Sequence, residues 1–250
     1  MIDIMQFDKR SKAILMGLYL SRFDKQALES FGFTSFKQAY NVLGYSIGFI
    51  PKSIQNYRDE FDPLFPNGRK GWRNRNIRDY CREFYDLTQN WSFDLFYSVI
   101  RSFIDKETII DETFEPILTN RDVIVNRLIT GKAAEEYFIM NYKNIECFQN
   151  YNLTDTTNWG CGFDFKLSLD IERYYIEVKG LNGQSGGILM TEKEYTVAKQ
   201  FKDKYCLFIV SNFRDKPKHN MYFNPTECSN IDFRRREQQI TQVSYSASFL

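Results

Sequence analysis

Hydrophobic residues recur at helical spacing through most of the first half of the chain. The stretch KAILMGLYLSRF, residues 12–23, has this spacing and predicts a helix. A second helix is predicted over residues 34–45, TSFKQAYNVLGY, where Thr34 has the residue type of an N-cap. A third helix should start at Pro51, which suits a first helical turn, and end before the prolines of DPLFP. The last two helices, joined by GYSIGF, resemble a helix-turn-helix arrangement.

The pattern changes after Pro116. Residues 163–171, FDFKLSLDI, alternate strictly between apolar and polar, which indicates a strand with one buried face. Residues 205–213, YCLFIVSNF, are almost continuously apolar, as expected of a strand buried on both faces. Thr191 and Glu194 have the spacing of a capping box and mark the start of a helix. In chain order, the pattern predicts a helix over 121–142, strands over 145–149, 163–171 and 174–180, a helix over 191–204 and a strand over 205–213.

These two patterns divide the chain into two predicted domains. Residues 1–118 should form a mostly α-helical domain, and residues 119–250 an α/β domain with the order helix, three strands, helix, strand. A length of 250 residues permits one large domain or two small ones. Hydrophobic residues make up 43% of the chain and aromatic residues 17%, which is enough to fill a hydrophobic core.

Composition disfavours several classes of protein. The 33 Lys and Arg residues nearly balance the 32 Asp and Glu residues, so only local clusters of charge bear on partners. No apolar run approaches the ~20 residues of a membrane span, and the N-terminus, MIDIMQFDKR, lacks the pattern of a signal peptide. Five scattered cysteines without a CxxC disfavour zinc sites and disulfides, which fits a cytoplasmic location. His219 is the only histidine, and we interpret it as a surface residue rather than a catalytic one.

Two of the predicted strands, 163–171 and 174–180, combine an apolar face with a few charged residues. Alternate residues of a strand share a face, so Asp164 belongs to the polar face of the first strand, and Glu177 and Lys179 to that of the second. The connection between them is short, which predicts an antiparallel hairpin. Both apolar faces must meet one core, so odd positions of the first strand should pair with even positions of the second. Asp164 should then lie opposite, or one pair away from, Glu177 and Lys179.

This polar patch has the parts needed for phosphodiester hydrolysis. Mg²⁺ prefers oxygen ligands, and one or two carboxylates plus a substrate phosphate suffice to hold it. A bound metal polarises the phosphoryl group and acidifies a water, while a neighbouring lysine can orient that water or stabilise charge. Two alternatives stay open. The patch could be a solvated sheet face without chemistry, or Lys166, in a D-x-K triplet with Asp164, could replace Lys179.

The segment GFDF…YYIEVKG…ILMTEKEYTVAKQFKDKYCLFIV resembles the PD-(D/E)XK nuclease superfamily. Within it, the segment is similar to the Mrr-like nuclease domain of restriction systems, which the plant protein NO VEIN shares at its C-terminus. The shared pattern is a Gly–aromatic–Asp strand start, an I-E-V-K-G strand, an L-x-T-x-x-E helix start and a Tyr-led apolar strand. The resemblance spans roughly residues 120–212 and implies a restriction-endonuclease-like core. Phe163 stands where many members have proline before Asp164, a departure that the superfamily tolerates.

The resemblance also implies roles for individual residues, with Mg²⁺ as the cofactor. It makes Asp164, Glu177 and Val178 metal ligands, and it makes Asp164, Glu177, Lys179 and Glu135 catalytic groups, with Glu135 as an auxiliary acid.

The choice of Glu135 over its neighbour Glu136 also has a physical argument. Glu135 shares a helical stripe with Phe138 and Ile139 and should point inward, whereas Glu136 should lie on a more solvated face. A helix-surface acid is the alternative interpretation of Glu135.

A basic segment in the first half is predicted to contact DNA. Residues 65–84, FPNGRKGWRNRNIRDYCREF, cluster Arg and Lys around Trp72, a combination that suits phosphate and base contacts. The helix before it offers residue types that read base edges in the major groove. As an alternative, these arginines could pair with Asp59, Glu60 and Asp62. The predicted DNA-binding residues are Lys52, Gln55, Asn56, Arg58, Arg69, Lys70, Arg73 and Arg75.

Together, these observations predict a Mg²⁺-dependent DNA endonuclease that resembles a type II restriction endonuclease. The helical domain would recognise double-stranded DNA, and the α/β domain would cut it. No Walker-type G-x-x-x-x-G-K-[ST] is present, so we expect no nucleotide cofactor. A homodimer is expected because one centre cuts one strand. The alternatives are a catalytically silent DNA-binding or interaction module and a nuclease that reads modified bases.

Overall fold

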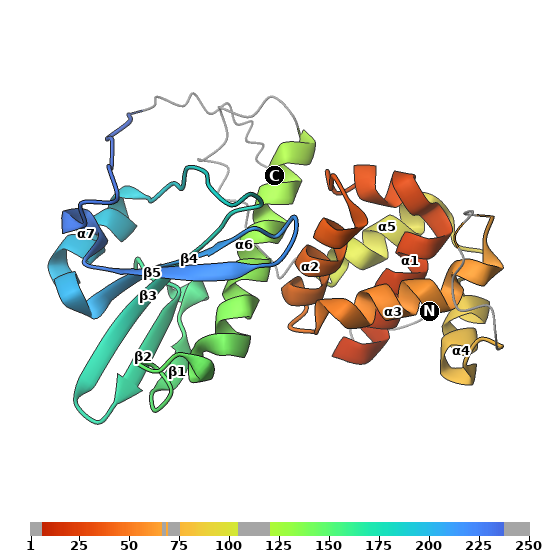
Figure 1. The fold of residues 1–250 in the computed structure, drawn as a ribbon, viewed down its shortest axis with the longest axis horizontal. Coiled ribbons are helices and arrows are strands. Elements are labelled where there is room, and N and C mark those ends of the chain that lie inside the picture. Colours follow the sequence, from red (N-terminus) through yellow and green to blue (C-terminus); the bar gives the residue numbers. More distant parts are fainter. Residues whose placement is uncertain (1–6, 67–68, 70–75, 105–120, 238–250) are drawn as a thin grey trace, which may run out of the picture.

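The structure is a computed structural model that describes residues 7–66, 69, 76–104 and 121–237. A helical half and a sheet-containing half lie side by side, and the long helix α6 (Arg121–Asn141) lies where they meet (Figure 1). In the described part of the chain, no helix is long and apolar enough to cross a membrane.

The helical half is built around α1 (Lys9–Glu29), whose middle is buried on all sides. Asp8 caps its N-terminus by accepting a hydrogen bond from the backbone of Ser11. Gly17 allows a close approach to the neighbouring helix α3, because a Cβ atom at this position would lie 2.5 Å from the Cβ of Tyr57. The other helices among the described residues of this half are α2 (Phe36–Ser46), α3 (Pro51–Phe61), the 3-10 turn η2 (Asp62–Leu64), α4 (Asp79–Thr88) and α5 (Phe93–Ser102).

The helices predicted in the first half are present, with one correction at α2. Ser35, not Thr34, is its N-cap, because the Ser35 side chain accepts from the backbone N–H of Gln38. Thr34 instead donates its backbone N–H to the Gln38 side chain at 2.8 Å. Helices α2 and α3 follow one another and both pack on α1. Their use as a DNA-reading helix-turn-helix stays a prediction.

The second half contains a five-stranded mixed sheet in the order β1-β2-β3-β4-β5. Neighbouring strands are antiparallel except β3 and β4, which are parallel and are connected through α7 (Glu192–Phe201). Helix α6 packs on one face of the sheet, and α7 lies on the opposite face (Figure 1). The strands are β1 (Asn152–Asp155), β2 (Phe165–Leu169), β3 (Glu172–Gly180), β4 (Tyr205–Ser211) and β5 (Lys218–Phe223).

The observed order is the predicted helix, three strands, helix and strand, with two corrections. Residues 145–149 form a turn instead of a strand, and the first strand begins at Asn152. The physical reason is that Ile145 and Phe148, three positions apart, are the buried residues, which is turn or helical spacing and not alternation. The second correction is β5, which the sequence pattern did not predict. This strand lies at the edge of the sheet, its residues are exposed or partly exposed, and it lacks a run of apolar residues.

The predicted register of the hairpin is confirmed. Phe165 pairs with Ile176 and Leu167 with Tyr174, so odd positions of β2 face even positions of β3. Asp164 continues this ladder, since its backbone N–H donates to the carbonyl of Ile176 at 2.9 Å. One face of both strands therefore packs against α6, while the face with the charged residues is turned toward α7.

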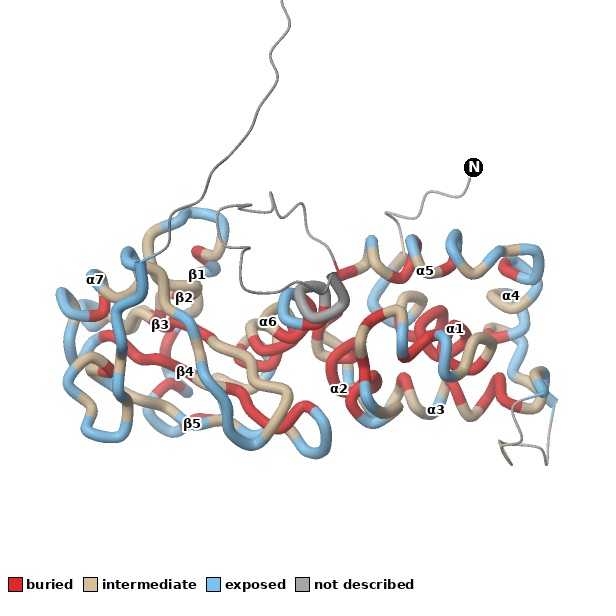
Figure 2. The backbone as a smooth tube through the Cα atoms, turned by 90° about the horizontal axis from the view of Figure 1, so that it is seen from above, coloured by how far each residue is buried: buried red, intermediate tan, exposed pale blue. Residues whose placement is uncertain are grey.

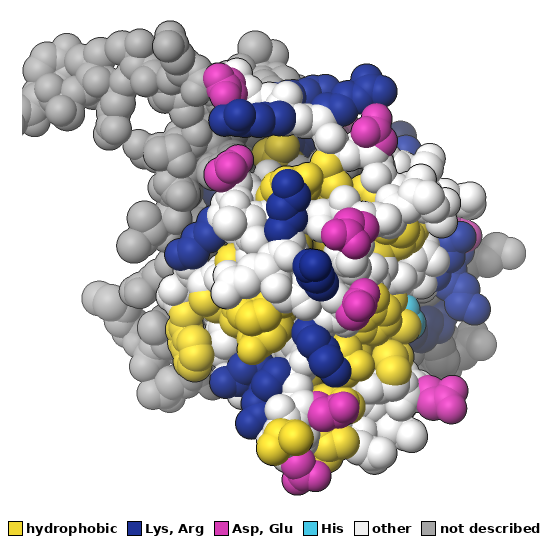
Figure 3. Space-filling view, turned by 90° about the vertical axis from the view of Figure 1, so that its left-hand side faces the viewer, with side chains coloured by type: hydrophobic (Ala, Val, Ile, Leu, Met, Phe, Trp, Pro, Cys, Tyr) yellow, Lys and Arg dark blue, Asp and Glu magenta, His cyan; other side chains and the backbone are white. Residues whose placement is uncertain are grey.

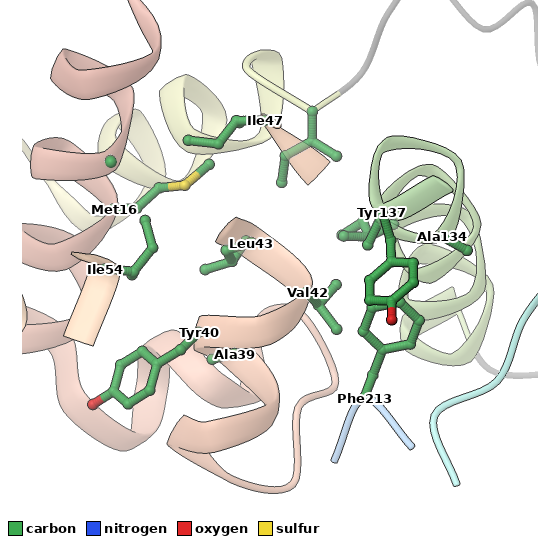
Figure 4. Close-up of a cluster of buried hydrophobic side chains, with 14 of the residues drawn as sticks. Met16, Ala39, Tyr40, Val42, Leu43, Ile47, Ile54, Ala134, Tyr137 and Phe213 are labelled. Carbon is green, nitrogen blue, oxygen red and sulfur yellow. The ribbon is translucent and has the colours of Figure 1, made fainter. Parts of the chain in front are cut away.

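The two halves share one hydrophobic core, which runs through α1 and α2 on one side and the central strands on the other (Figure 2). At their junction, Val42 of α2 lies beside Tyr137 of α6 and Phe213 (Figure 4). The ring of Tyr45 is 5.1 Å from that of Tyr137. This apolar contact joins the two regions of the chain, and their division at residue 118 into separate domains stays a prediction.

Candidate active site

Asp164 and Glu177 meet where β2 and β3 pair. The backbone N–H of Val178 donates to Oδ2 of Asp164 at 2.8 Å, which fixes that carboxylate against β3. Glu177 lies on the α7 side of the sheet, and its exposed fraction is only 2%. A buried carboxylate is costly unless a cation or donor compensates it, so its partner is informative.

That partner is Lys179, two residues further along the same face of β3. Its ammonium lies 2.6 Å from Oε1 of Glu177 and 3.0 Å from Oε2 of Glu194 on α7. The Lys179 side chain is 21% exposed, so it can still be reached from one side. The strand therefore presents one buried carboxylate and one accessible cation.

Helix α7 covers part of this patch and leaves Lys179 reachable from one side. Its N-terminus carries the predicted capping box, in which Thr191 accepts from the backbone of Glu194 and Glu194 accepts from the backbone of Thr191. The C-terminal end of α7 is held on the sheet by Phe201, whose ring stacks on Tyr175 at 3.9 Å. The 2% exposure of Glu177 beneath this helix disfavours a fully solvated sheet face, while Lys179 remains partly exposed.

Burial and mutual repulsion change the acidity of the carboxyl groups. Burial raises the pKa of Asp164 to about 7, and the charge of Glu135 adds to the effect, while the Val178 hydrogen bond and Lys179 oppose it. Burial raises the pKa of Glu177 well above its ordinary value, with Asp164 adding to the shift. Burial lowers the pKa of Lys179, but the carboxylates around it outweigh that effect and the net pKa is raised. Lys179 is therefore a cation near neutral pH.

The donor set fits a hard divalent cation. Asp164 and Glu177 each use one oxygen in the bonds above, and their second oxygens can serve a cation whose charge would relieve the repulsion between them. In the described ranges, no three His, Cys, Asp or Glu side chains form a group that could hold a metal ion. A cation would thus take two carboxylates and complete its shell with water or phosphate, as Mg²⁺ does. Val178, whose side chain is buried and apolar, could contribute only its backbone oxygen.

Residues 134–223 match the family model described as Protein NO VEIN, C-terminal. This is a nuclease-like domain family, and the match covers less than half of the 250-residue chain. It extends from the second half of α6 to β5, and so includes the whole patch between β3 and α7. No curated protein and no solved structure matches the chain.

Glu135 lies on α6 close enough for its charge to raise the pKa of Asp164. The predicted contrast with Glu136 is wrong, because the Glu135 side chain is 24% exposed and that of Glu136 only 15%. Both carboxylates pair with Lys132, at 3.1 and 3.4 Å. The reason is tertiary: the helical half covers the Glu136 side of α6, where a Cβ atom on Gly48 would lie 2.8 Å from Oε2 of Glu136.

Glu194 is the functional candidate that the sequence interpretation missed. Its place in a capping box was recognised, and that local role concealed its second contact with Lys179. The signal available in the sequence was a glutamate at the start of the helix that follows the Lys179 strand.

The predicted DNA-contacting residues are distributed differently from the prediction. On α3, Lys52 and Asn56 are exposed, and Gln55 is partly exposed and accepts a hydrogen bond from Lys52 at 2.9 Å. Arg58 is a correction, because it is 1% exposed and cannot reach a base edge. Its guanidinium pairs with Asp24 at 2.6 Å and donates to the Tyr40 hydroxyl at 3.0 Å.

Arg69 pairs with acidic residues of the preceding helix and turn, which was the alternative to DNA contact for the basic segment. It pairs with Asp59 at 2.5 Å and with Asp62 at 3.0 Å, so its charge is used within its own half. Lys70, Arg73 and Arg75 lie outside the described residues.

His219 lies away from the candidate site. Its ring stacks on Phe208 at 4.8 Å, and its Nδ1 is 3.2 Å from the Tyr137 hydroxyl. Burial lowers its pKa. These contacts give it a packing role on β5, on the α6 side of the sheet, in place of the expected surface position.

Proposed function

We propose that this protein is a Mg²⁺-dependent DNA endonuclease of the PD-(D/E)XK type, and within that class a type II restriction endonuclease. The observation that carries the proposal is the convergence of Asp164, Glu177 and Lys179 beneath α7, with Glu177 2% exposed and Lys179 held at 2.6 Å from it. Acids with raised pKa values beside a reachable lysine are typical of catalytic sites. The match of this segment to a nuclease-like domain family supports the same conclusion.

The arrangement of the second half supports a restriction-endonuclease-like core. A mixed sheet with α6 on one face and α7 on the other brings the start of β2 and the end of β3 together at one end of the sheet. The acids there come from the residue before β2, from β3 and from a helix, so tertiary structure fixes their spacing.

Within this proposal, each residue has a separate task. Asp164 and Glu177 would hold the cation, and the Val178 backbone oxygen would be a third donor. When bound, Mg²⁺ polarises the scissile phosphate and acidifies a water. Lys179 orients that water or neutralises charge on the phosphate, and its ion pair with Glu194 aims its ammonium into the patch. Glu135, on α6, is the auxiliary acid beside Asp164.

DNA recognition is assigned to the helical half. The exposed side of α3, with Lys52, Gln55 and Asn56, offers a charged and amide-rich surface for the major groove. The α7 end of the molecule is less suitable for a purely electrostatic contact, because basic and acidic side chains are interspersed there (Figure 3). Since one centre cuts one strand, a homodimer would cut both strands of the duplex.

The deciding experiment is a cleavage assay with the full chain. Plasmid DNA, methylated and unmethylated, is incubated with the protein in Mg²⁺ and, in parallel, in excess chelator. We expect cleavage with Mg²⁺ and none with chelator. Cleavage of methylated DNA alone would indicate a modification-dependent nuclease. Binding without cleavage under all conditions would indicate a catalytically silent DNA-binding module and would overturn the proposal.

A further inference from the structure

A chain of amide side chains crosses the junction between the two halves. Gln38 on α2 donates its side-chain N–H to Oδ1 of Asn182, at 3.0 Å. Asn182, which follows β3, donates in turn to Oδ1 of Asn126 on α6 at 2.6 Å. The hydroxyl of Thr130, also on α6, lies 3.2 Å from Oδ1 of Asn182. We call these four residues the amide cluster.

The amide cluster is buried except for Asn182, which is partly exposed, and it is anchored at Asn126 to the helical half. Gln38, Asn126 and Thr130 are between 2% and 7% exposed. Asn126 donates to the backbone carbonyls of Phe31 and Gly32, at 3.1 and 2.9 Å. Because both ends of the Asn126 and Asn182 amides are engaged, neither amide can turn over without breaking bonds. Buried polar groups of this kind are costly to leave unmatched, so the cluster fixes a single geometry.

The backbone between the amide cluster and Lys179 is short and tightly packed. Asn182 is only three residues after Lys179. Gly180 between them touches α6 so closely that a Cβ atom there would lie 2.6 Å from the carbonyl oxygen of Thr130. Leu181 donates its N–H to the carbonyl of Val210 on β4 at 2.8 Å. A displacement of Asn182 would therefore be passed along the backbone to Lys179.

We infer that Asn182 is a positioning residue that makes the placement of Lys179 depend on the helical half. Gln38 is the link on α2, and α2 packs on α3, whose exposed side is assigned to DNA. DNA held on the helical half would thus act on the catalytic strand through a hydrogen-bonded path. This inference rests on the proposed function for its link to cleavage, and its structural part can be tested without cleavage.

The structure supplies a matched control on the same helix. Asn41 is 9% exposed and also joins α2 to the second half, donating to the carbonyls of Phe213 and Asp215 at 2.8 Å each. Those acceptors lie between β4 and β5, not next to Lys179. Loss of this bond weakens the same junction and leaves the side-chain bonds of the amide cluster in place. The loop that carries these acceptors contacts the cluster only through backbone, where the Arg214 N–H donates to the Asn182 carbonyl at 3.0 Å.

The experiment compares Gln38→Met with Asn41→Leu in the full chain. Both changes remove the amide and keep much of its volume. Melting temperature, DNA affinity, single-turnover cleavage in Mg²⁺ and hydrogen exchange of residues 178–182 are measured for each. We expect similar losses of melting temperature. Only Gln38→Met should speed exchange of that segment and slow cleavage, by about 10- to 100-fold, because small misplacements of catalytic groups are that costly. DNA affinity should change little.

Equal exchange and equal cleavage in the two variants would overturn the inference. If Gln38→Met does not fold, Thr130→Val is held to the same criteria, because it removes the hydroxyl that contacts Oδ1 of Asn182 and donates to the Asn126 carbonyl at 2.6 Å. If the wild-type protein does not cut DNA, the proposed function fails, whereas the exchange comparison still decides whether the cluster positions the Lys179 strand.

Discussion

Lys179 on β3 and Glu194 on α7 form an ion pair of 3.0 Å, although Glu194 also caps its own helix through the backbone N–H of Thr191. This double contact gives Glu194 a task that a helix cap alone does not need. When a cation occupies Glu177, the ammonium of Lys179 loses part of its attraction to that carboxylate. Glu194 then remains to hold it.

Glu194→Gln should separate the two tasks, because an amide oxygen can still accept from Thr191 but carries no charge toward Lys179. We expect the single-turnover cleavage rate to fall by about tenfold or more, with little change in melting temperature. Thr191→Ala is the control: it should cost about 1 kcal/mol of stability and leave the rate nearly unchanged. A Glu194→Gln variant with a lower melting temperature and a wild-type cleavage rate would show that Glu194 serves only as a helix cap.

Lys179→Ala should abolish Mg²⁺-dependent cleavage and leave DNA binding near the wild-type level. The reason is that the ammonium sits between Glu177 and Glu194 in the patch, away from the exposed side of α3. Lys166→Ala serves as the comparison, because Lys166 is on β2, paired with Tyr175, and belongs to the rival triplet. Cleavage lost in the Lys166 variant and kept in the Lys179 variant would reverse the assignment.

Without metal, stability should depend on pH through Asp164. Its pKa is raised from an ordinary 3.8 to about 7, so folding favours the protonated form. That contribution is fully present below about pH 3.8 and is lost as pH rises through about 7. In chelator, the melting temperature of the wild type should therefore fall relative to that of Asp164→Asn between about pH 5 and about pH 8.

Mg²⁺ should reverse this loss in the wild type and have little effect on Asp164→Asn, because the cation binds the ionised carboxylates. Asp86→Asn, which changes an exposed carboxylate on α4, controls for a general effect of charge. Parallel melting curves for wild type and Asp164→Asn across this pH range would show that Asp164 does not titrate as described.

Arg58 and Lys52, both on α3, should behave in opposite ways. Arg58→Ala should cost about 3–5 kcal/mol of unfolding free energy, since it removes a buried guanidinium that pairs with Asp24 and with the fully buried Asp62. Lys52→Ala should leave the melting temperature unchanged and reduce the salt slope of DNA binding by about 0.9, the value for one lost phosphate contact. An unchanged slope would place the DNA surface elsewhere than on α3.

The sequence alone determined the local framework of this protein. The alternation of residues 163–171 set the register of the hairpin, because a slip of one residue would have turned its apolar face to solvent. The capping box of Thr191 and Glu194 marked the start of α7, since such a box involves only neighbours in the chain. The grouping of Asp164 with Glu177 followed from the same strand parity.

Tertiary structure decided which polar residues are buried and what they contact. Arginine is a residue type that reads DNA bases, and Arg58 was predicted to do so. In the fold, Arg58 instead pairs with Asp24, which is 34 positions away in the sequence. Residues 145–149 form a turn and not the predicted strand, because in this conformation both Ile145 and Phe148 pack into the core. The bond between Gln38 and Asn182 joins residues 144 positions apart. Periodicity reports which face of an element is apolar, but the partner of a charge or an amide depends on distant segments that packing brings together.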